Sequence, residues 1–451
     1  MSPTTRHLFG TDGLRARFGA APLDRPTVTS LAAHLGAMLR EQAGEAAEPP
    51  LVVLGGDTRE STPVIGHWLA EGLEAAGARV RSAGVIPTPG VAWLVRELGA
   101  AAGAVISASH NPWPDNGIKL IDPSGFKWSE AAEAALERHL ESGTKEIPER
   151  AEPLPVDAAL GARYLDRLAA SVPGLEGLRV VLDTGNGAAS SYAAALFERL
   201  GATAVALHRD PDGRNVNEGC GSTAPGEMAA RVVAERAHLG AAFDGDADRC
   251  ILADERGEVR DGDAILYLWA TALHHSGRLQ PPRIVATTMS NLGLERALAR
   301  EGIGIARCDV GDRYVVETLR REGIALGGEQ SGHVVHLEHG STGDGLLTAV
   351  QIAAIVAQGT LPLSGRLAGF RRYPQTLQNV RVARKPDLLS LPRVAAAIRA
   401  VEEKIGADGR LVLRYSGTEP LARVMIEGPD QTSIEALAGD LAAAIREEIG
   451  A

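Results

Sequence analysis

The segment RVVLDTGNGA (residues 179–188) decides the fold, because it has the pattern of a buried strand that ends in glycines and polar groups. A helical stretch ending in LFERLGA (196–202) and a second short strand, TAVALH (203–208), follow it. The same order of strand, polar turn, helix and strand starts at LVVLGGDTR (51–59) and at RIVATTMSN (283–291). Each unit is a β-α-β motif whose polar loop lies where open parallel sheets bind ligands. Three such motifs, about a hundred residues apart, predict three related α/β domains.

The C-terminal part has a different order of elements. The strand-like segments TLQNVRVA (376–383), GRLVLRYSG (409–417) and ARVMIEG (422–428) alternate with helical stretches at 391–405 and 433–449. We therefore predict an α/β protein in which three domains with mixed, largely parallel sheets and a smaller C-terminal α+β domain surround a central cleft. The predicted domains cover residues 1–149, 150–252, 253–366 and 367–451.

The composition limits the classes of partner. The net charge is −11, which argues against nucleic acid, although a local cluster of arginines can still bind a small anion. No run approaches the roughly 20 apolar residues of a membrane span, and the first residues, MSPTTRHLFGTDGLR, lack the apolar segment of a signal peptide. Cys220, Cys250 and Cys308 are isolated, so neither a disulfide framework nor a cysteine zinc site is expected. We expect a cytoplasmic protein without a nucleic-acid or membrane partner.

Three carboxylates alternate in the segment FDGDADRC: Asp244, Asp246 and Asp248. In an extended segment alternate residues point to one side, so the three carboxylates converge. Their mutual repulsion favours a hard cation such as Mg²⁺, which prefers oxygen ligands. An EF-hand loop starting at Asp244 would have Glu255 at its twelfth position but Arg249 at its sixth, where glycine is required. A solvated acidic turn is the remaining alternative.

Two further loops suit a phosphorylated sugar. LGGEQSGHVV puts Glu329, Ser331 and His333 on one side of a glycine-rich turn, where they can bind sugar hydroxyls. RYSGTEPLARV offers hydroxyls between two arginines, the usual surroundings of a phosphate. Its candidate ligands are Arg414, Ser416, Gly417, Thr418 and Arg423. An ordinary hairpin turn is the alternative for the first loop, and a surface turn for the second. Because the chain has neither a Walker sequence nor a GxGxxG fingerprint, the phosphate is expected on a small substrate rather than on a nucleotide.

The segment GAVISASHNPWPDNGIKL (103–120) starts as a buried strand and then breaks into hydroxyls, an imidazole and prolines. It places Ser107, Ser109 and His110 at a sheet edge, without a convincing acyl-transfer triad. Two other polar turns, FGTDGLR and VGDRYV, add three candidates, for which a structural role is the alternative: Arg15, Asp312 and Arg313. A cation site, a strand-end serine, a phosphate-binding loop and a sugar-binding loop together suit a phosphorylated sugar that is held at both ends.

These motifs occur together in one known superfamily. SASHNPWPDNGIK, DGDADR, GGEQSGH and RYSGTEP follow one another in the order found in the α-D-phosphohexomutases, so the chain resembles that superfamily over essentially its whole length. Within it, the chain is most similar to the bacterial phosphoglucosamine mutases, because of FGTDGLR, NVNEGCGST (215–223), VGDRYV and Gln330. Relatives that act on mannose or glucose phosphates usually have methionine at the position of Gln330. Two departures, Tyr415 in place of a common proline and DGLRA in place of DGIRG, bear on loop shape and weaken mainly the inferred specificity.

The resemblance implies a role for each candidate. Ser109 would be the phosphorylated residue, and its phosphate would bind one Mg²⁺ together with Asp244, Asp246 and Asp248. The residues implied around the reacting oxygen are Arg15, His110 and Lys119. The residues implied at the sugar are Glu329, Ser331, His333, Asp312 and Arg313. The residues implied at the phosphates are Arg414, Ser416, Gly417, Thr418 and Arg423 for the one that is not transferred, with Arg249 in addition.

The implied reaction interconverts glucosamine 6-phosphate and glucosamine 1-phosphate, which feeds the synthesis of UDP-N-acetylglucosamine and cell-wall precursors. Because phosphoryl transfer prefers in-line oxygens, a phosphoserine would donate its phosphate to form a hexosamine or hexose 1,6-bisphosphate and then take back the other one. Lys119, with a pKa lowered near Mg²⁺ and arginines, is the first candidate for the base, and His110 is the second. A bisphosphate primer or an activating kinase would supply the first phosphate. The chain is expected to be a monomer or a homodimer.

Three alternatives remain open. A phosphomannomutase or phosphoglucomutase would perform the same chemistry on another sugar. A Mg²⁺-dependent sugar-phosphate phosphatase would pass the phosphate to water. A non-catalytic sensor would bind the sugar phosphate without converting it.

Overall fold

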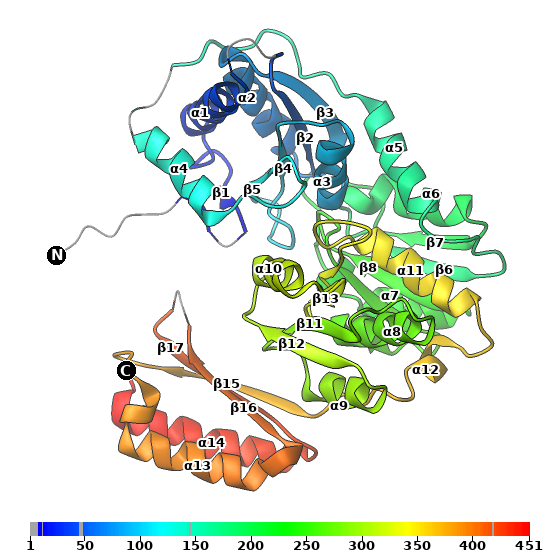
Figure 1. Cartoon of the computed structure of the whole chain (residues 1–451), viewed down its shortest axis with the longest axis vertical. Helices are drawn as coiled ribbons and strands as arrows, with labels where there is room; N and C mark the ends of the chain where they lie inside the picture. Colours follow the sequence, from blue (N-terminus) through cyan, green and yellow to red (C-terminus); the bar gives the residue numbers. More distant parts are fainter. Residues whose placement is uncertain (1–7, 11, 45–47, 142, 144–145, 417–418) are drawn as a thin grey trace. The chain divides into compact units, whose positions relative to one another are not determined.

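The computed structural model describes residues 8–10, 12–44, 48–141, 143, 146–416 and 419–451 (Figure 1). These residues form two units. The first unit runs up to Thr287 and resumes over Ala306–Leu367, and the second consists of Thr288–Ile305 and Ala368–Ala451. The first unit contains the first two segments that have the β-α-β pattern and part of the third, whose residues 288–305 belong to the second unit.

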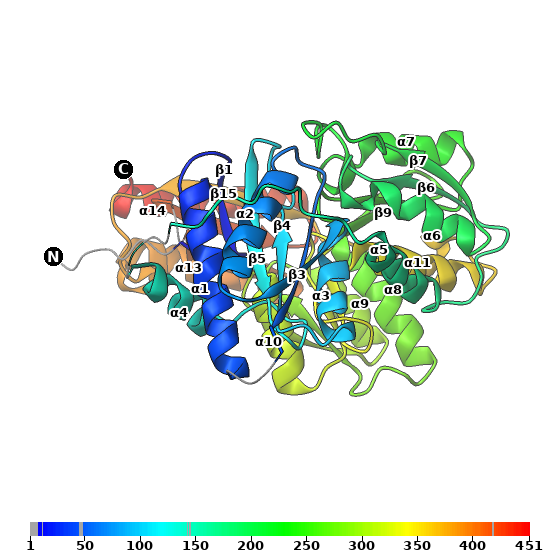
Figure 2. The same ribbon diagram turned by 90° about the horizontal axis from the view of Figure 1, so that it is seen from above.

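The first α/β segment forms a five-stranded sheet with helices on both faces. Its elements are β1 (Leu14–Arg17), α1 (Arg25–Ala43), β2 (Leu51–Gly56), α2 (Thr62–Ala75), β3 (Arg79–Val85), α3 (Thr88–Glu97), β4 (Ala102–Ile106), β5 (Asp115–Ile121) and α4 (Glu130–Glu141). The strand order is β1-β5-β4-β2-β3, in which β2, β3 and β4 are parallel and β5 is antiparallel to β4. The β2-α2-β3 and β3-α3-β4 crossovers run in opposite directions, so α2 and α3 cover opposite faces of the sheet (Figure 2).

Helices α1 and α2 pack closely because of local sequence. Asp24 caps α1, since its side chain accepts the Thr27 N–H at 3.0 Å, and Pro26 lies in the first turn. A Cβ at Gly72 of α2 would collide with the Thr29 carbonyl of α1, so glycine allows the two helices to approach. The buried side chains of β2, β4 and β5, such as Leu54, Ile106 and Ile118, complete this core.

The second α/β segment repeats the topology. Its elements are α5 (Ala158–Ala169), β6 (Arg179–Asp183), η1 (Ala188–Ser191), α6 (Ala193–Arg199), β7 (Thr203–Leu207), η2 (Gly221–Thr223), α7 (Gly226–Ala234), β8 (Leu239–Phe243), β9 (Cys250–Asp254) and β10 (Val259–Arg260). The strand order is β10-β9-β8-β6-β7, with β6, β7 and β8 parallel and β9 antiparallel to β8. All five residues of β8 and of β9 are buried.

The third α/β segment has a four-stranded sheet. Its elements are α8 (Gly262–His275), β11 (Arg283–Thr287), α9 (Leu292–Arg300), β12 (Gly304–Cys308), α10 (Asp312–Glu322), β13 (Leu326–Gly328), β14 (Val334–His336), α11 (Gly345–Ala357) and α12 (Leu363–Arg366). The strand order is β12-β11-β13-β14, with β11 and β13 parallel and β13 and β14 antiparallel. Helix α9 lies in the part of this segment that belongs to the second unit.

The loops that carry the sequence motifs occupy equivalent positions in the three sheets. The loop with Ser109 joins parallel β4 to antiparallel β5, and the loop with Asp244 joins β8 to β9. The loop with Glu329 joins β13 to β14 in the same way. Each loop therefore leaves the carboxyl end of a parallel strand, the edge at which open α/β sheets place their ligands.

The second unit has an antiparallel sheet of order β15-β17-β16, with α13 and α14 on one face (Figure 1). Besides α9, its elements are β15 (Gln375–Arg381), η3 (Leu388–Ser390), α13 (Pro392–Ile405), η4 (Gly406–Asp408), β16 (Arg410–Tyr415), β17 (Leu421–Glu427) and α14 (Gln431–Ile449). Its core joins sheet and helices through buried side chains such as Val424, Ile426, Leu441 and Ile445.

The predicted fold class is confirmed: three α/β segments with mixed sheets precede a smaller α+β part. The domain boundaries near residues 149, 252 and 366 stay predictions. No helix in the described part of the chain is long and apolar enough to cross a membrane.

Candidate active site

Ser109 lies in the loop that follows β4. Its backbone is left-handed, with φ 53°, and its Oγ donates to Asp244 Oδ2 at 2.5 Å. The Ser109 N–H donates to Ser107 Oγ at 2.8 Å, and Ser107 Oγ donates to the buried Asp57. His110 Nδ1 is 3.3 Å from Ser109 Oγ. Of the two serines, Ser109 faces the acidic cluster, whereas Ser107 holds the backbone of the loop.

The acidic cluster is Asp244, Asp246 and Asp248, as the alternating sequence predicts. Their exposed fractions are 0%, 0% and 3%, and carboxylate oxygens of the three lie within 4.8 Å of one another. Burial raises the pKa of Asp244, and the charges of Asp248 and Asp246 raise it further. Three buried carboxylates this close repel one another, and a cation bound between them would remove that repulsion.

The donor set fits a hard divalent cation such as Mg²⁺. Asp246 Oδ1 and Asp248 Oδ1 are buried and have no hydrogen-bond partner among the described residues. Oxygen-only ligands of this kind suit Mg²⁺. The two alternatives for this loop are wrong: a solvated turn would be exposed, and an EF-hand would be flanked by helices rather than by β8 and β9.

Lys119, on β5, is paired with the acidic cluster from the other side. Its side chain is 1% exposed, and its Nζ lies 2.8 Å from Asp246 Oδ2 and 3.2 Å from Asp12 Oδ2. Burial lowers the pKa of Lys119, but Asp12, Asp246 and Asp248 outweigh it and hold that pKa well above its ordinary value. The lowered pKa of Lys119 was expected beside a bound Mg²⁺ and stays a prediction, whereas the carboxylates alone raise that pKa. The pKa of Lys119 rises because three carboxylates surround the ammonium, and their effect outweighs that of the Arg15 charge.

A row of ion pairs continues from this cluster to α10. Lys127 pairs with Asp12 and also with Asp312, at the start of α10. His333 Nε2 lies 3.8 Å from Asp312 Oδ2 and accepts the Gly343 N–H at 3.2 Å. Asp12 and Lys127 thus connect the acidic cluster to the loop predicted to bind the sugar.

A cavity of about 300 Å³ brings eight of the predicted site residues together. Its predicted lining residues are Arg15, His110, Asp248, Arg249, Asp312, Arg313, Glu329 and His333. Glu329 accepts the Gly311 N–H at 3.1 Å, and burial raises the pKa of its carboxyl group. Ser331 is outside this lining, and none of the described residues forms a hydrogen bond with its buried Oγ. The cavity offers cations and hydrogen-bonding groups for a polar anion of sugar size.

Comparison with known proteins agrees with this geometry. Four domains of the phosphoglucomutase/phosphomannomutase family match in order: alpha/beta/alpha domain I at residues 6–147, domain II at 162–257, domain III at 261–373 and the C-terminal domain at 377–444. The phosphoglucosamine mutase of Solibacter usitatus is 47% identical over 99% of this chain and 99% of that protein. The chain belongs to the phosphoglucomutase/phosphomannomutase family. The predicted resemblance is thereby confirmed.

Further similar proteins support the same family assignment. The phosphoglucosamine mutase of Koribacter versatilis is 44% identical over 100% of this chain and 99% of that protein. A solved family protein from Burkholderia thailandensis is 25% identical, with a TM-score of 0.78 and 97% of each chain covered. The N-acetylphosphoglucosamine mutase of Aspergillus fumigatus, in complex with GlcNAc-6P and magnesium, is 17% identical and shares the fold, with a TM-score of 0.64 over 98% of this chain and 95% of that chain.

The candidate phosphate loop of this family member lies in the second unit, between β16 and β17. Arg414 and Arg423 are direct cross-strand partners, an unfavourable arrangement of like charges, and Arg423 also pairs with Glu419 at 3.1 Å. Lys385 Nζ donates to the Ser416 carbonyl at 2.5 Å and adds a third cation. The predicted ligands Gly417 and Thr418 lie outside the described residues.

Several supporting residues were not singled out from the sequence. The Ser109 carbonyl accepts hydrogen bonds from Asn217 Nδ2 at 2.9 Å and from the buried Arg59 at 3.2 Å. Arg59 also donates to the Asn111 carbonyl at 2.6 Å and pairs with Asp57. The polar end of LVVLGGDTR and the NVNEGCGST loop were the available signals, since both place polar groups after or near strand ends.

Proposed function

We propose that this chain is a phosphoglucosamine mutase, which interconverts glucosamine 6-phosphate and glucosamine 1-phosphate. The observation that carries the proposal is the position of Ser109 Oγ, 2.5 Å from Asp244 at the edge of a buried acidic cluster. A hydroxyl beside a cation site suits the transfer of a phosphoryl group, whose charge the cation neutralises. The choice of glucosamine is supported by full-length relatives named phosphoglucosamine mutase, which are 42% to 47% identical to the chain.

The proposed reaction stores one phosphoryl group on Ser109. The P–Oγ bond of phospho-Ser109 breaks while a P–O bond to the free sugar hydroxyl forms, and the hydroxyl proton passes to a base. The resulting 1,6-bisphosphate turns around, its other phosphoryl group returns to Ser109 Oγ, and a proton returns to the sugar oxygen that is released. This route satisfies the preference of phosphoryl transfer for in-line oxygens.

The residues that would hold one Mg²⁺ are Asp244, Asp246 and Asp248, together with a phosphate oxygen on Ser109. When bound, the cation supplies charge neutralisation for the transferring group. The magnesium in the complex of the Aspergillus fumigatus enzyme supports this choice. A hexosamine or hexose 1,6-bisphosphate would serve as primer and intermediate.

Two residues remain candidates for the base. His110 Nδ1 lies 3.3 Å from Ser109 Oγ, within reach of a proton that moves at the reacting oxygen. Lys119 is held as an ammonium by the carboxylates around it, but a cation bound to Asp246 and Asp248 would oppose that effect. As an ammonium, Lys119 stabilises the negative charge of the transferring group.

The remaining site residues are proposed to hold the two ends of the sugar phosphate. Glu329, His333 and Arg313 lie in one cavity with Arg249 and Arg15, which suits a phosphorylated sugar. Arg414, Ser416 and Arg423 would bind the phosphate that is not transferred, since an anion relieves the repulsion between the two facing arginines. The predicted contributions of Gly417 and Thr418 belong to the same loop.

The test compares the two serines of one loop. Ser109→Ala is expected to lower turnover by about 10³-fold or more, because it removes the group that carries the phosphoryl. Ser107→Ala keeps the acceptor hydroxyl and is expected to retain a phosphate on Ser109, measured by intact mass and peptide mapping. Turnover is compared on glucosamine, glucose and mannose phosphates, and free phosphate is measured in parallel. Active Ser109→Ala enzyme would exclude the phosphoserine route, and stoichiometric release of free phosphate would identify a phosphatase instead.

A further inference from the structure

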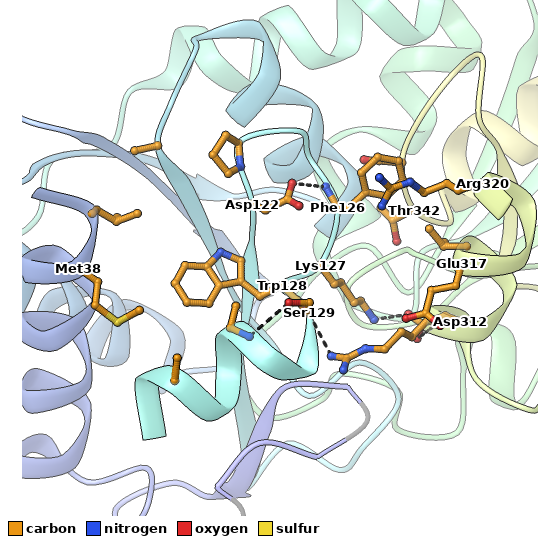
Figure 3. A pocket seen from close by; sticks show the side chains of 18 of the residues that line it. Met38, Asp122, Phe126, Lys127, Trp128, Ser129, Asp312, Glu317, Arg320 and Thr342 are labelled. Atoms are coloured by element: carbon orange, nitrogen blue, oxygen red, sulfur yellow. Dashed lines mark hydrogen bonds and ion pairs between the residues drawn. The ribbon is translucent and has the colours of Figure 1, made fainter. Parts of the chain in front are cut away.

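The first unit contains a second cavity, of about 430 Å³, which is larger than the one at the candidate active site. It lies between α1, residues 122–135 and the first turns of α10, and we call it the α10 cavity (Figure 3). Ser109 and the three aspartates of the cluster are not among its lining residues. Its volume lies within the range of small-molecule sites in proteins, roughly 300–1,000 Å³.

The α10 cavity and the active-site cavity are separated by the start of α10. Asp312 and Arg313 line both of them. Lys127, on the wall of the α10 cavity, pairs with Asp312 and with Asp12, and Asp12 pairs with Lys119 of the active site. A molecule in the α10 cavity would thus touch the same ion pairs that hold the active-site residues in place.

The lining of the α10 cavity is apolar on one side. Met38 and Leu39 of α1 line this side together with Trp128, which is 6% exposed. Figure 3 shows Met38 and Trp128 on one side of the cavity and Glu317 and Arg320 of α10 on the other. A flat aromatic body suits the side formed by the indole and the thioether.

The opposite side offers a cation for an anionic group. The Arg320 guanidinium lies over the Phe126 ring, 4.4 Å from its centroid, so its orientation is fixed by stacking. Within the part of the chain that the structure describes, no carboxylate lies within 4.0 Å of Arg320. Glu317 is one turn away on the same helix, and it limits how much negative charge the site accepts.

We propose that the α10 cavity binds a small molecule with an aromatic body and one anionic group. Its aromatic body lies against Trp128 and Met38, and its anionic group pairs with Arg320. Binding also fixes α10 against residues 122–135. Because α10 begins with Asp312 and Arg313, occupation of the cavity changes the affinity of the active site for its sugar phosphate; this coupling rests on the proposed function, whereas the binding itself does not.

The binding test uses 8-anilinonaphthalene-1-sulfonate, which has an aromatic body and one anionic group and fluoresces in apolar surroundings. The unmodified chain is expected to bind one molecule per chain. Arg320→Met is expected to weaken binding about tenfold or more, the loss expected for a hydrogen bond to a charged group. Glu317→Gln is expected to strengthen it, because it removes a nearby like charge. Arg321→Met is the matched control, since Arg321 is the next arginine of α10 and is not among the lining residues.

A second pair of variants tests the cavity volume without changing charge. Ala132→Phe places a ring in the cavity and is expected to abolish binding, whereas Ala131→Phe, on the neighbouring residue outside the lining, is expected to leave it unchanged. Melting temperatures check that all variants fold. Equal affinity in Arg320→Met and Arg321→Met, or unchanged binding in Ala132→Phe, would overturn the proposal.

The coupling has its own readout. The sulfonate is expected to change the Kd of glucosamine 6-phosphate, and the sugar phosphate is expected to change the sulfonate Kd by the same factor, with both constants measured at equilibrium. Binding at the α10 cavity with no change in either constant would overturn the coupling. Sulfonate binding that follows the variants in a chain without mutase activity would overturn the proposed function but support the cavity.

Discussion

The Ser109 region of the first unit and the β16–β17 loop of the second unit both face phosphate in the proposed reaction, but they are built in opposite ways. In the first, Lys119 is 1% exposed and lies between carboxylates of other segments. In the second, Arg423 is 34% exposed at its side chain, and its cross-strand partner is another arginine. The first region pairs its ammonium with buried carboxylates and leaves Asp246 Oδ1 and Asp248 Oδ1 for a cation. In the second region two arginines face each other, and Arg423 also pairs with the exposed Glu419. Substitutions in the first should therefore change chemistry and folding together, and those in the second should change affinity alone.

The largest effect is expected when a buried cation of the first region is removed. Lys119→Met leaves Asp12, Asp246 and Asp248 without their shared partner, and breaking a buried pair costs about 3–5 kcal/mol. Turnover is expected to fall by about 10²-fold or more, with phosphorylation of Ser109 still detectable. The melting temperature in metal-free buffer is expected to fall and to recover in part with Mg²⁺. Near-normal turnover would exclude Lys119 both as base and as charge stabiliser. Lys404→Met, at an exposed position in the last turn of α13, serves as the control in the second unit.

A smaller loss is expected from the residue that holds the backbone of Ser109. Asn217→Ala removes the hydrogen bond to the Ser109 carbonyl, worth about 1–2 kcal/mol when the acceptor keeps one partner, Arg59. We expect a roughly tenfold lower kcat with an unchanged KM, since Asn217 donates to the backbone of the proposed nucleophile, Ser109. Asn215→Ala, in the same loop but bonded to Asp210, is the control. A rise in KM without a change in kcat would assign Asn217 to the substrate instead.

In the second region the expected effect is limited to affinity. Arg423→Gln is expected to raise the KM for the sugar phosphate about tenfold, as for one lost hydrogen bond to a charged group, and to leave kcat unchanged. Its melting temperature is expected to change little, because the substitution removes both the repulsion with Arg414 and the exposed ion pair with Glu419. Arg381→Gln is the control, because it makes the same charge change at a position opposite Leu421. A fall in kcat with constant KM for Arg423→Gln would make this loop part of the chemistry and would remove the contrast between the two regions.

The smallest effect on catalysis is expected from His336 of β14, which affects acid stability instead. Burial lowers the pKa of His336 to about 4, and His339 and Arg278 contribute. Because the unfolded chain binds this proton near pH 6.5, stability is lost as the pH falls from 6.5 towards 4, by up to about 3 kcal/mol. His336→Phe keeps the stack on Trp269, whose ring centroid lies 5.2 Å from that of His336, and should flatten the dependence of melting temperature on pH in this range. An unchanged slope would assign the acid sensitivity to other groups, with His339→Asn as the comparison.

The sequence predicted the parts of the site that lie within single loops. Asp244, Asp246 and Asp248 alternate on one short segment, so their convergence follows from strand geometry alone. The sign of the pKa shift of Lys119 was not predictable in this way. It depends on Asp12 and Asp246, which lie on either side of Lys119 in the sequence and meet it only in the folded chain.

The supporting groups escaped prediction for the same reason. Asn217 and Ser109 are 108 positions apart, and Arg59 reaches Ser109 from a loop 50 positions away. Secondary structure was predicted well where periodicity was strong: the last helix, expected at 433–449, is α14, Gln431–Ile449, and it starts two residues earlier because Asp430 caps it. Hydrophobic periodicity gives no information about such a cap, because the cap is a side-chain hydrogen bond before the first turn.

Helix α9 gives the second unit a discontinuous chain. Its N-terminal cap, Asn291, donates to Glu427 Oε1 at 2.9 Å, and the Leu292 N–H donates to the other oxygen of this fully buried carboxylate. A gene fragment that starts at residue 368 would encode Glu427 without these donors. The C-terminal part therefore makes these two hydrogen bonds only when residues 288–305 accompany it. A chimaera that keeps both hydrogen bonds of this chain has to contain Thr288–Ile305 as a second, separate segment.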